Sequence, residues 1–401
     1  MSFVTHCACV VCGRAAPLPG SAGVCPACND PSATLEIHFD LGRVRASMTR
    51  DALAARPLNH WRYAELLPIE PDATAFAWPV GWTPILETPR LAAWAGVQRL
   101  RIKDEGRNHT GSFKDRASSV GVLHAAQIGD TTIACASTGN AASSCAGFAA
   151  MAGIRATIFV PQRAPGPKVA QLLIFGADVR RVRGTYAQAY DLCNARCAEH
   201  GWHNRNCAIN PYLVEGKKTC GLEIAEQTGH DPPGWVVISV GDGCTVAGVC
   251  KGLMQMHELG FIGRVPRVLG VQALGVDPVA VAFETGSLPT DRAGETMADS
   301  IDVPVPRNWR KAVERVRAVG GAFVRVGNDE IAEAMKAAGA LAGIFAEPAA
   351  AASIAGVRRA IAEGVIGPTE SVLAVSTGSG LKDVDSAIAV AGEPTDVQPL
   401  P

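Results

Sequence analysis

The chain has 401 residues, of which 48% are hydrophobic and 19% are charged, and its formal net charge at pH 7 is −1. This length allows two domains of ordinary size, and a near-neutral charge without basic runs argues against a nucleic-acid partner or a membrane surface. The apolar stretches, such as residues 341–354, are interrupted and too short to span a bilayer. Residues 1–6 do not resemble a signal peptide, and the thirteen cysteines are odd in number and scattered, so we expect a cytoplasmic protein with reduced thiols.

The first forty residues carry two closely spaced pairs of cysteines. Cys9 and Cys12 form one C-x2-C pair, and Cys25 and Cys28 form a second pair twelve residues later. Two such pairs supply four thiolates for one tetrahedral Zn²⁺. The spacing predicts a structural zinc ribbon, because four protein ligands leave no open position for catalysis. The alternative is a set of free thiols in a cysteine-rich chain.

Residues 41–95 carry much of the aromatic content, and from about residue 98 short β-type runs alternate with longer amphipathic segments. The predicted strands are 100–103, 132–136, 156–160, 179–182, 235–240, 268–272, 322–326 and 371–375. The predicted helices include 140–152, 168–175, 186–199, 215–227, 329–341 and 348–363. Strand–helix–strand alternation predicts an α/β protein with mainly parallel sheets, in which ligands gather at the carboxyl ends of the strands.

Lys114 is the first candidate for chemistry. It follows a polar Gly/Ser/Thr turn in the segment DEGRNHTGSFKD (104–115), and a helix is predicted from Asp115 to about Gln127. A lysine at a loop-to-helix junction beside apolar neighbours loses its proton cheaply and becomes an amine nucleophile. Such an amine most often forms a Schiff base, and pyridoxal phosphate (PLP) is the common aldehyde cofactor.

Three polar turns follow predicted strands and therefore meet at one edge of the sheets. The turn at residues 137–140 suits a carboxylate at a helix N-terminus, the turn at 241–245 suits a phosphate, and the turn at 377–380 offers a hydroxyl to a ring nitrogen. Each has a plainer interpretation as a helix cap or a Gly-rich turn. Asp242 is an awkward neighbour for a dianion, so its side chain should point away or toward a cation. The three turns contain Ser137, Thr138, Gly139 and Asn140; Gly241, Asp242, Gly243, Cys244 and Thr245; and Thr377 to Gly380.

Taken in order, these segments resemble the fold-type-II PLP enzymes, in the tryptophan synthase β-like superfamily, and specifically the threonine synthase branch. The matching segments are KDEGRNHTGSFKDR (103–116), ASTGNAASS (136–144), NPYLVEGKKT (210–219), VGDGC (240–244), EPAAAAS (347–353) and TGSGLKD (377–383). Some members also carry an N-terminal zinc ribbon. The resemblance implies an amino-acid substrate and a homodimer.

The resemblance also implies a role for each turn. Lys114 would hold PLP as a Schiff base and act as the general base. Asn140 would bond the phenolic oxygen of PLP, the 241–245 turn would cradle its phosphate, and Thr377 would face its pyridine nitrogen. Ser137, Thr138, Gly139 and Asn140 would bind the substrate. Glu347 has a plain interpretation as the N-terminal dipole partner of the helix that begins at Pro348.

The chain departs from the threonine synthase pattern where that enzyme holds a substrate phosphate. The positions of a Ser, an Arg and an Asn correspond to Ala208, Leu213 and Asp242, and a usual Thr is Ala141. A phosphate dianion needs several charge-assisted donors, so these changes favour a substrate that is not phosphorylated. Arg107, Arg307 and Lys217 are the residues available to compensate.

These observations divide the chain and leave three functions open. We predict a ribbon over 1–40, an arm over 41–95, a large PLP-binding domain over 96–136 and 206–392, a small substrate-closing domain over 137–205 and a flexible tail over 393–401.

The first function is a PLP-dependent lyase of the ammonia-lyase or dehydratase type, acting by β- or γ-elimination or replacement. The second is an authentic threonine synthase acting on O-phosphohomoserine. The third is a non-catalytic zinc-ribbon interaction protein.

Overall fold

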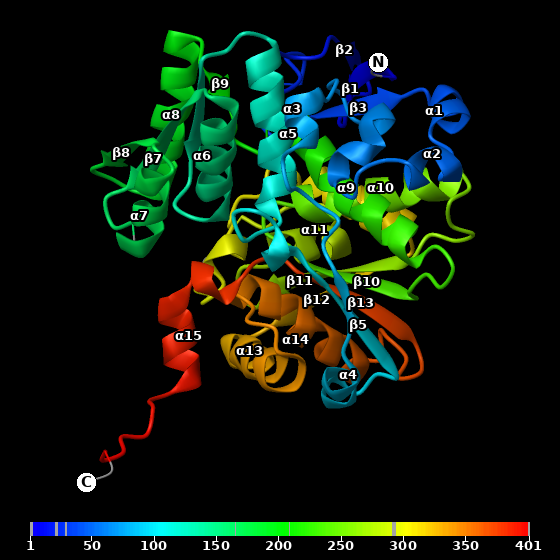
Figure 1. The fold of residues 1–401 in the computed structure, drawn as a ribbon, viewed down its shortest axis with the longest axis vertical. Coiled ribbons are helices and arrows are strands. Elements are labelled where there is room, and N and C mark those ends of the chain that lie inside the picture. Colours follow the sequence, from blue (N-terminus) through cyan, green and yellow to red (C-terminus); the bar gives the residue numbers. More distant parts are fainter. Residues whose placement is uncertain are drawn as a thin grey trace.

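A six-stranded sheet forms the centre of the larger lobe in the computed structural model (Figure 1). Its strand order is β12-β11-β10-β13-β5-β4, and all neighbours are parallel except the short edge pair β4–β5. The bounds are β4 Ile85–Glu87, β5 Arg99–Asp104, β10 Trp235–Ser239, β11 Arg267–Ala273, β12 Ala322–Val326 and β13 Ser371–Ser376. The structure describes residues 3–20, 23–28, 30–164, 166–207, 209–290 and 294–399, with residue 167 described by its backbone alone.

Helices cover both faces of this sheet because alternate strand residues enter two different hydrophobic cores. Val236 and Ile238 of β10 pack with α9, α10 and α12, whereas Trp235 and Val237 pack with α4, α13 and α14. Burial on both faces explains the continuous aliphatic runs from which these strands were predicted. The helix bounds are α4 Pro89–Ala95, α9 Pro211–Thr228, α10 Cys244–Glu258, α11 Pro278–Thr285, α12 Trp309–Ala318, α13 Asn328–Ala342, α14 Pro348–Ala362 and α15 Val384–Ala391.

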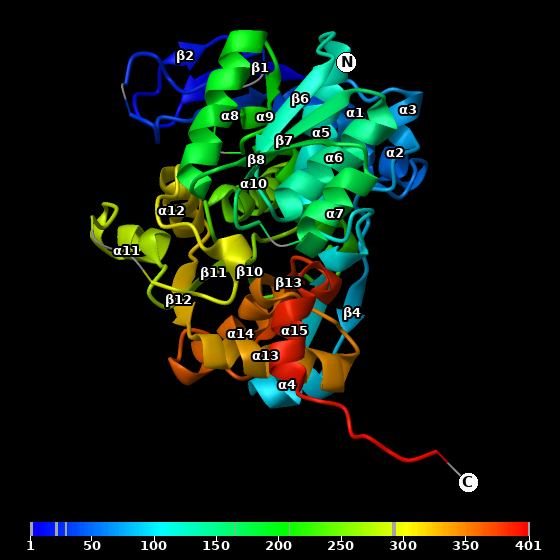
Figure 2. The same ribbon diagram turned by 90° about the vertical axis from the view of Figure 1, so that its left-hand side faces the viewer.

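A four-stranded parallel sheet forms the smaller lobe, which projects beside the first (Figure 2). Its order is β8-β7-β6-β9, with bounds β6 Thr132–Ala136, β7 Arg155–Pro161, β8 Asp178–Val182 and β9 His203–Asn204. Helices α5 Lys114–Gln127 and α6 Asn140–Ala152 pack on one face and α8 Tyr186–His200 on the other, while α7 Gly166–Ile174 packs against α6.

The N-terminal segment forms a three-stranded antiparallel sheet in the order β2-β1-β3, with bounds β1 Val4–Cys9, β2 Ala15–Ala16 and β3 Leu35–Phe39. Buried charges attach it to the larger lobe: Lys251 of α10 pairs with Glu36 at 2.6 Å and donates to the Ile37 carbonyl at 2.6 Å. The arm that follows contains α1 Leu41–Ser47, α2 Arg50–Ala54, η1 His60–Leu66 and α3 Ala73–Phe76, and three further 3-10 turns lie at η2 Glu105–Arg107, η3 Asp299–Ile301 and η4 Gly380–Lys382.

The predicted α/β class, the eight strands and the named helices are confirmed, with ends that shift by a few residues. The short strands β4 and β9 and the N-terminal sheet were not predicted. The division into domains stays a prediction, but β6 pairs within the four-stranded sheet, whereas the predicted boundary placed residues up to 136 in the large domain. Residues 1–2, 21–22 and 29 of the predicted ribbon, and 400–401 of the predicted tail, lie outside the described residues.

None of the helices described is long and apolar enough to cross a membrane. The cytoplasmic location and the homodimer stay predictions of the sequence.

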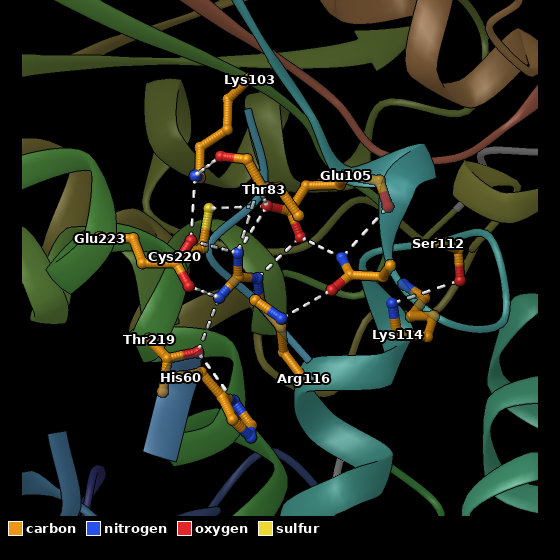
Figure 3. Close-up of polar contacts among 12 residues, drawn as sticks. His60, Thr83, Lys103, Glu105, Ser112, Lys114, Arg116, Thr219, Cys220 and Glu223 are labelled. Carbon is orange, nitrogen blue, oxygen red and sulfur yellow. Dashed lines mark hydrogen bonds and ion pairs between the residues drawn. The ribbon is translucent and has the colours of Figure 1, made fainter. Parts of the chain in front are cut away.

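A buried charge cluster fixes the start of α5 (Figure 3). Arg116 pairs with Glu105 of the preceding 3-10 turn at 2.7 Å and with Glu223 of α9 at 2.7 Å, and Glu223 also pairs with Lys103 of β5 at 3.0 Å. All four side chains are fully buried. His60 lies beside them, and burial lowers its pKa to about 3, so it stays neutral. Two cations therefore balance two carboxylates inside the protein, and β5, α5 and α9 are held in one register.

We expect Arg116→Met to lower the free energy of unfolding by about 3–5 kcal/mol, because it leaves two buried carboxylates with one cation. Urea unfolding of the PLP-free protein measures this. The matched control is Arg358→Met, which removes a 2.9 Å ion pair with Glu333 in which both side chains are more than half exposed, and should cost less than about 1 kcal/mol. Equal and small effects of the two substitutions would contradict the assignment.

Candidate active site

Lys114 is the first residue of α5, and the turn before it is fixed by its own polar groups. Asp115 accepts hydrogen bonds from the Thr110 amide, at 2.6 Å, and from the Thr110 hydroxyl. Gly111 adopts a φ of +86°, a conformation that side chains with a Cβ rarely adopt. The Gly/Ser/Thr residues that the sequence placed before Lys114 therefore build a closed turn that presents the lysine.

The Lys114 side chain is partly exposed, but its amine lies in a poorly solvated place. Burial, and then the nearby Lys217 ammonium, lower the pKa of Lys114 to about 8. Among the described residues, no carboxylate forms an ion pair with it. About a tenth of this amine is unprotonated at pH 7, far more than for an ordinary lysine, and a Schiff-base nucleophile requires the unprotonated form.

The last strand of the large sheet places Thr377 beside the lysine turn. The Phe113 amide donates to the Thr377 carbonyl at 2.8 Å, and the Ser379 amide donates to the Gly111 carbonyl at 3.0 Å. These bonds join segments far apart in the sequence because β5 and β13 are neighbours in the sheet. The predicted proximity of Lys114 and Thr377 is thus present in the structure.

Asn140 meets a carboxylate that the sequence did not place in the site. Its side-chain amide donates to both oxygens of Glu347, at 3.0 and 2.8 Å, and the Glu347 amide donates to the Gly378 carbonyl at 3.1 Å. Burial raises the pKa of Glu347 to about 7, while Asn140 opposes this shift. A Cβ on Gly378 would lie 2.5 Å from the Glu347 carboxyl, so a larger residue there would displace the carboxylate from Asn140. Glu347 links the Asn140 turn to the Thr377–Gly378 turn and is more than a helix dipole partner.

A cleft of about 110 Å³ opens between the two lobes, smaller than the roughly 300–1,000 Å³ of most small-molecule sites. Thr138, Gly139 and Asn140 line it, whereas Ser137 is not among its lining residues. Lys168 of α7 pairs across it with Asp299 of η3. The remaining lining residues include Ser143, Gln171, Ser300, Glu347 and Lys382. The predicted substrate turn therefore faces the cleft at three of its four residues.

The predicted phosphate turn starts α10 at Cys244 and leaves the first amides of that helix without helical partners. Gly243 has a φ of +90°, and a Cβ on it would lie 2.9 Å from the Asn308 carbonyl oxygen, so glycine is required. The Asp242 carboxylate accepts from the Arg307 amide at 2.8 Å and from the Asn308 side-chain amide at 3.4 Å. It is thus bound to the 307–308 loop, as expected for a carboxylate beside an anion site.

Three residues lie near this turn: Arg205 and Cys207, to which the sequence assigned no role, and Lys217, which it named only as a possible compensating cation. Their charges, with that of Cys244, act on Lys114, so they lie close to it. Leu213 packs on α5, where a Cβ on Gly121 would lie 2.6 Å from its methyl carbon. Ala208 lies outside the described residues. Contacts within and across helix α9 decide these neighbourhoods, and no local pattern reveals them.

The donor set fits PLP. The chain offers the groups that PLP needs: the poorly solvated amine of Lys114, the unpaired amides at the start of α10, and the side chains of Asn140 and Thr377; of these, Asn140 lines the cleft. Lys114 would hold the aldehyde carbon, residues 241–245 the phosphate, and Asn140 and Thr377 the ring oxygen and nitrogen; these roles remain predictions.

Cys9, Cys12, Cys25 and Cys28 form a compact cluster in the N-terminal sheet. Their sulfur atoms all lie within 4.8 Å of one another, with Cys9–Cys28 at 3.7 Å and Cys12–Cys25 at 3.8 Å. Zn–S bonds of about 2.3 Å place tetrahedral sulfurs about 3.8 Å apart. The predicted ligand set therefore fits one structural Zn²⁺.

Known proteins resemble this chain over most of its length. Residues 78–378 match the family described as pyridoxal-phosphate dependent enzyme. The threonine synthase of Methanosarcina acetivorans is 36% identical over 98% of this chain and 96% of its own length. That of Methanocaldococcus jannaschii is 33% identical over 97% of this chain and 96% of its own length.

Solved structures share the fold. The threonine deaminase from T.th. has a TM-score of 0.65 and 25% identity, covering 74% of this chain and 92% of that chain. Diaminopropionate ammonia lyase from Escherichia coli has a TM-score of 0.68 and 16% identity, covering 87% of this chain and 91% of that chain. The second likeness concerns the fold alone.

We expect the purified protein to carry one Zn²⁺ per chain and Cys25→Ser to carry none, because the change removes one of four thiolates. Elemental analysis after purification in the presence of zinc measures this. Cys7→Ala is the matched control, since Cys7 is a fully buried thiol of the same strand as Cys9 but lies outside the cluster. Zinc-free wild-type protein would contradict the assignment.

Glu347 gives the stability a defined pH dependence. Its pKa rises from 4.5 to about 7 on folding, so between these values the native state binds more protons than the unfolded chain, and stability falls as the pH rises. We expect the free energy of unfolding of PLP-free wild type, relative to Glu347→Gln, to fall by up to about 3 kcal/mol from pH 4.5 to 7. Urea unfolding at several pH values measures it, and a constant difference would refute the shift.

Proposed function

Because the chain belongs to the pyridoxal-phosphate dependent enzyme family, in its threonine synthase branch, we propose that it is a lyase for a small amino acid, using Lys114 for elimination or replacement at the β or γ carbon. The observation that carries this proposal is the Lys114 amine with its pKa near 8, beside Thr377 and the Asn140–Glu347 pair. A non-catalytic interaction protein would have no use for such an amine.

Bound PLP supplies an aldehyde for the substrate amine and a ring that stabilises negative charge on the α-carbon. Lys114 then takes the α-proton, since its lowered pKa leaves it partly unprotonated at neutral pH. Thr377 would offer the ring nitrogen a neutral hydroxyl, which would leave that nitrogen less protonated than a carboxylate would. This favours elimination and replacement over transamination.

The start of α6 binds the substrate carboxylate in this proposal. Thr138 and Gly139 line the cleft directly before the helix that begins at Asn140, and helix N-termini attract anions. Ser137 donates nothing into the cleft directly, but its hydroxyl accepts from the Gly139 amide at 3.2 Å and so shapes the turn. Glu347 holds the Asn140 amide in place through two hydrogen bonds.

We further propose that the substrate is not phosphorylated. Leu213 is buried against α5, the Asp242 carboxylate adds negative charge beside the site, and Lys217 is engaged by the Cys207 sulfur. These side chains leave few charge-assisted donors for a second phosphate group. A β-eliminating ammonia-lyase or dehydratase fits such a site.

Authentic threonine synthase is the second candidate. The full-length similarity to two archaeal threonine synthases favours it, since each alignment covers 96% of the relative. In that case Lys217 and Arg307 would have to hold the phosphate of O-phosphohomoserine, with Lys217 released from Cys207.

The two candidates differ in the product released. We expect ammonia and a 2-oxo acid from serine, threonine or 2,3-diaminopropionate, and no phosphate from O-phosphohomoserine, because Leu213 and Asp242 replace two of the donors that the threonine synthase pattern supplies. Colorimetric ammonia and phosphate assays on one enzyme batch measure both. Release of phosphate with formation of threonine would establish the second candidate.

Two variants accompany this assay. Lys114→Ala should lose both the visible absorbance of bound PLP and all activity. Asp242→Asn removes the negative charge and should shift the preference toward phosphorylated substrates; an unchanged preference would count against a role for Asp242 in selecting the substrate.

A further inference from the structure

Cys207 and Lys217 form an unusual pair beside the 241–245 turn. The Lys217 ammonium, on α9, donates a hydrogen bond to the Cys207 sulfur. Lys217 is only 2% exposed, whereas Cys207, which follows β9, is partly exposed. A buried cation is thus directed at the sulfur of a partly exposed residue.

The surroundings of Cys207 are rich in positive charge. Arg205 is 1% exposed and donates to the Ser118 hydroxyl through Nε at 3.1 Å and Nη2 at 2.9 Å; in the described part of the chain no carboxylate pairs with it. Cys244 directs its thiol toward the Cys207 carbonyl at 3.7 Å and the Asp242 carboxylate at 3.0 Å. The Asp242 carboxylate that accepts from Cys244 is bound to the 307–308 loop.

These contacts favour the thiolate. Hydrogen bonding with the Cys244 thiol, together with Lys217 and Arg205, outweighs burial and holds the pKa of Cys207 well below its ordinary value. Burial raises the pKa of Cys135, Cys145, Cys220 and Cys250, and these thiols are also inaccessible. Cys12 is the other thiol with a lowered pKa, but it belongs to the predicted zinc ligands.

We propose that Cys207 is a reversible oxidation site at which hydrogen peroxide forms a sulfenic acid next to Lys114. The sulfur attacks one peroxide oxygen, an S–O bond forms, the O–O bond breaks, and the leaving hydroxide takes a proton to become water. Sulfur loses two electrons and peroxide gains two. A small-molecule thiol restores Cys207: one thiol displaces water to form a mixed disulfide, and a second releases Cys207 as the thiol.

The position of Cys207 connects this chemistry to the active site. Its charge acts on Lys114 and raises the pKa of that amine, so oxidation changes the field at the reacting nitrogen. Oxidised protein should therefore lose activity, and treatment with a thiol should restore it.

The test uses the full-length, PLP-loaded protein at pH 7, treated with hydrogen peroxide and then with dimedone, which traps sulfenic acids. Peptide mass spectrometry should place the adduct on Cys207 in wild type and on no residue in Cys207→Ser. Activity of wild type should fall with adduct formation and return with dithiothreitol. An adduct confined to Cys12, or no adduct, overturns the proposal whatever the substrate proves to be.

Lys217→Gln tests the cause of the reactivity. We expect alkylation of Cys207 by iodoacetamide at pH 7 to slow by at least about fivefold, because less thiolate is present. Lys218→Gln is the matched control. Lys218 pairs with Glu215, and in this variant Glu215 keeps its second partner, Lys251, at 2.5 Å. The rate of Cys207 alkylation should therefore not change. Equal rates in Lys217→Gln and wild type overturn the assignment of Lys217.

A wild-type measurement covers the case in which Lys217→Gln does not fold. The alkylation rate of Cys207 should stay within about twofold from pH 6.5 to 8.5, because the thiolate is already formed. A tenfold rise per pH unit, as an ordinary thiol shows, overturns the proposal.

Discussion

The neutral balance of Arg116 and Lys103 against Glu105 and Glu223 is the constraint on which the site depends. These residues lie on β5, the turn after it, α5 and α9, so one cluster sets the position of the first central strand relative to two helices. Lys114 lies two residues before Arg116, and Lys217 lies on the same helix as Glu223. Because buried charges tolerate little misplacement, the spacing between the reactive amine and α9 is fixed before any ligand binds.

Much of the fold was predictable because its physical causes are local. Strands such as β10 and β13 are short aliphatic runs buried on both faces, and α6 and α14 begin where the sequence places Asn140 and Pro348. Lys114 was predictable because its turn is built from consecutive residues. The contact of Asp242 with donors of the 307–308 loop agrees with the expectation, drawn from charge alone, that this carboxylate turns away from an anion.

The remaining features depend on partners distant in the sequence. The strand β9 has two residues and exists only because Ile133 and Ala134 of β6 offer it a partner, so it carries no periodic pattern. From the sequence, Glu347 was interpreted as the N-terminal dipole partner of α14. Its hydrogen bond with the Asn140 amide was not predictable, because the two residues are 207 positions apart. The Lys217–Cys207 contact joins a loop to the inner face of a helix, and only the packing of α9 decides that face.

The Lys168–Asp299 contact bears on how a substrate enters. It joins α7 of the smaller lobe to η3 of the larger one across the cleft, and the Asp299 side chain is 50% exposed. An ion pair so open to water contributes less than about 1 kcal/mol, and dissolved salt weakens it further. The free energy of this ion pair is therefore only a few RT or less. Thermal motion breaks the contact between the two lobes at this point without help from a ligand.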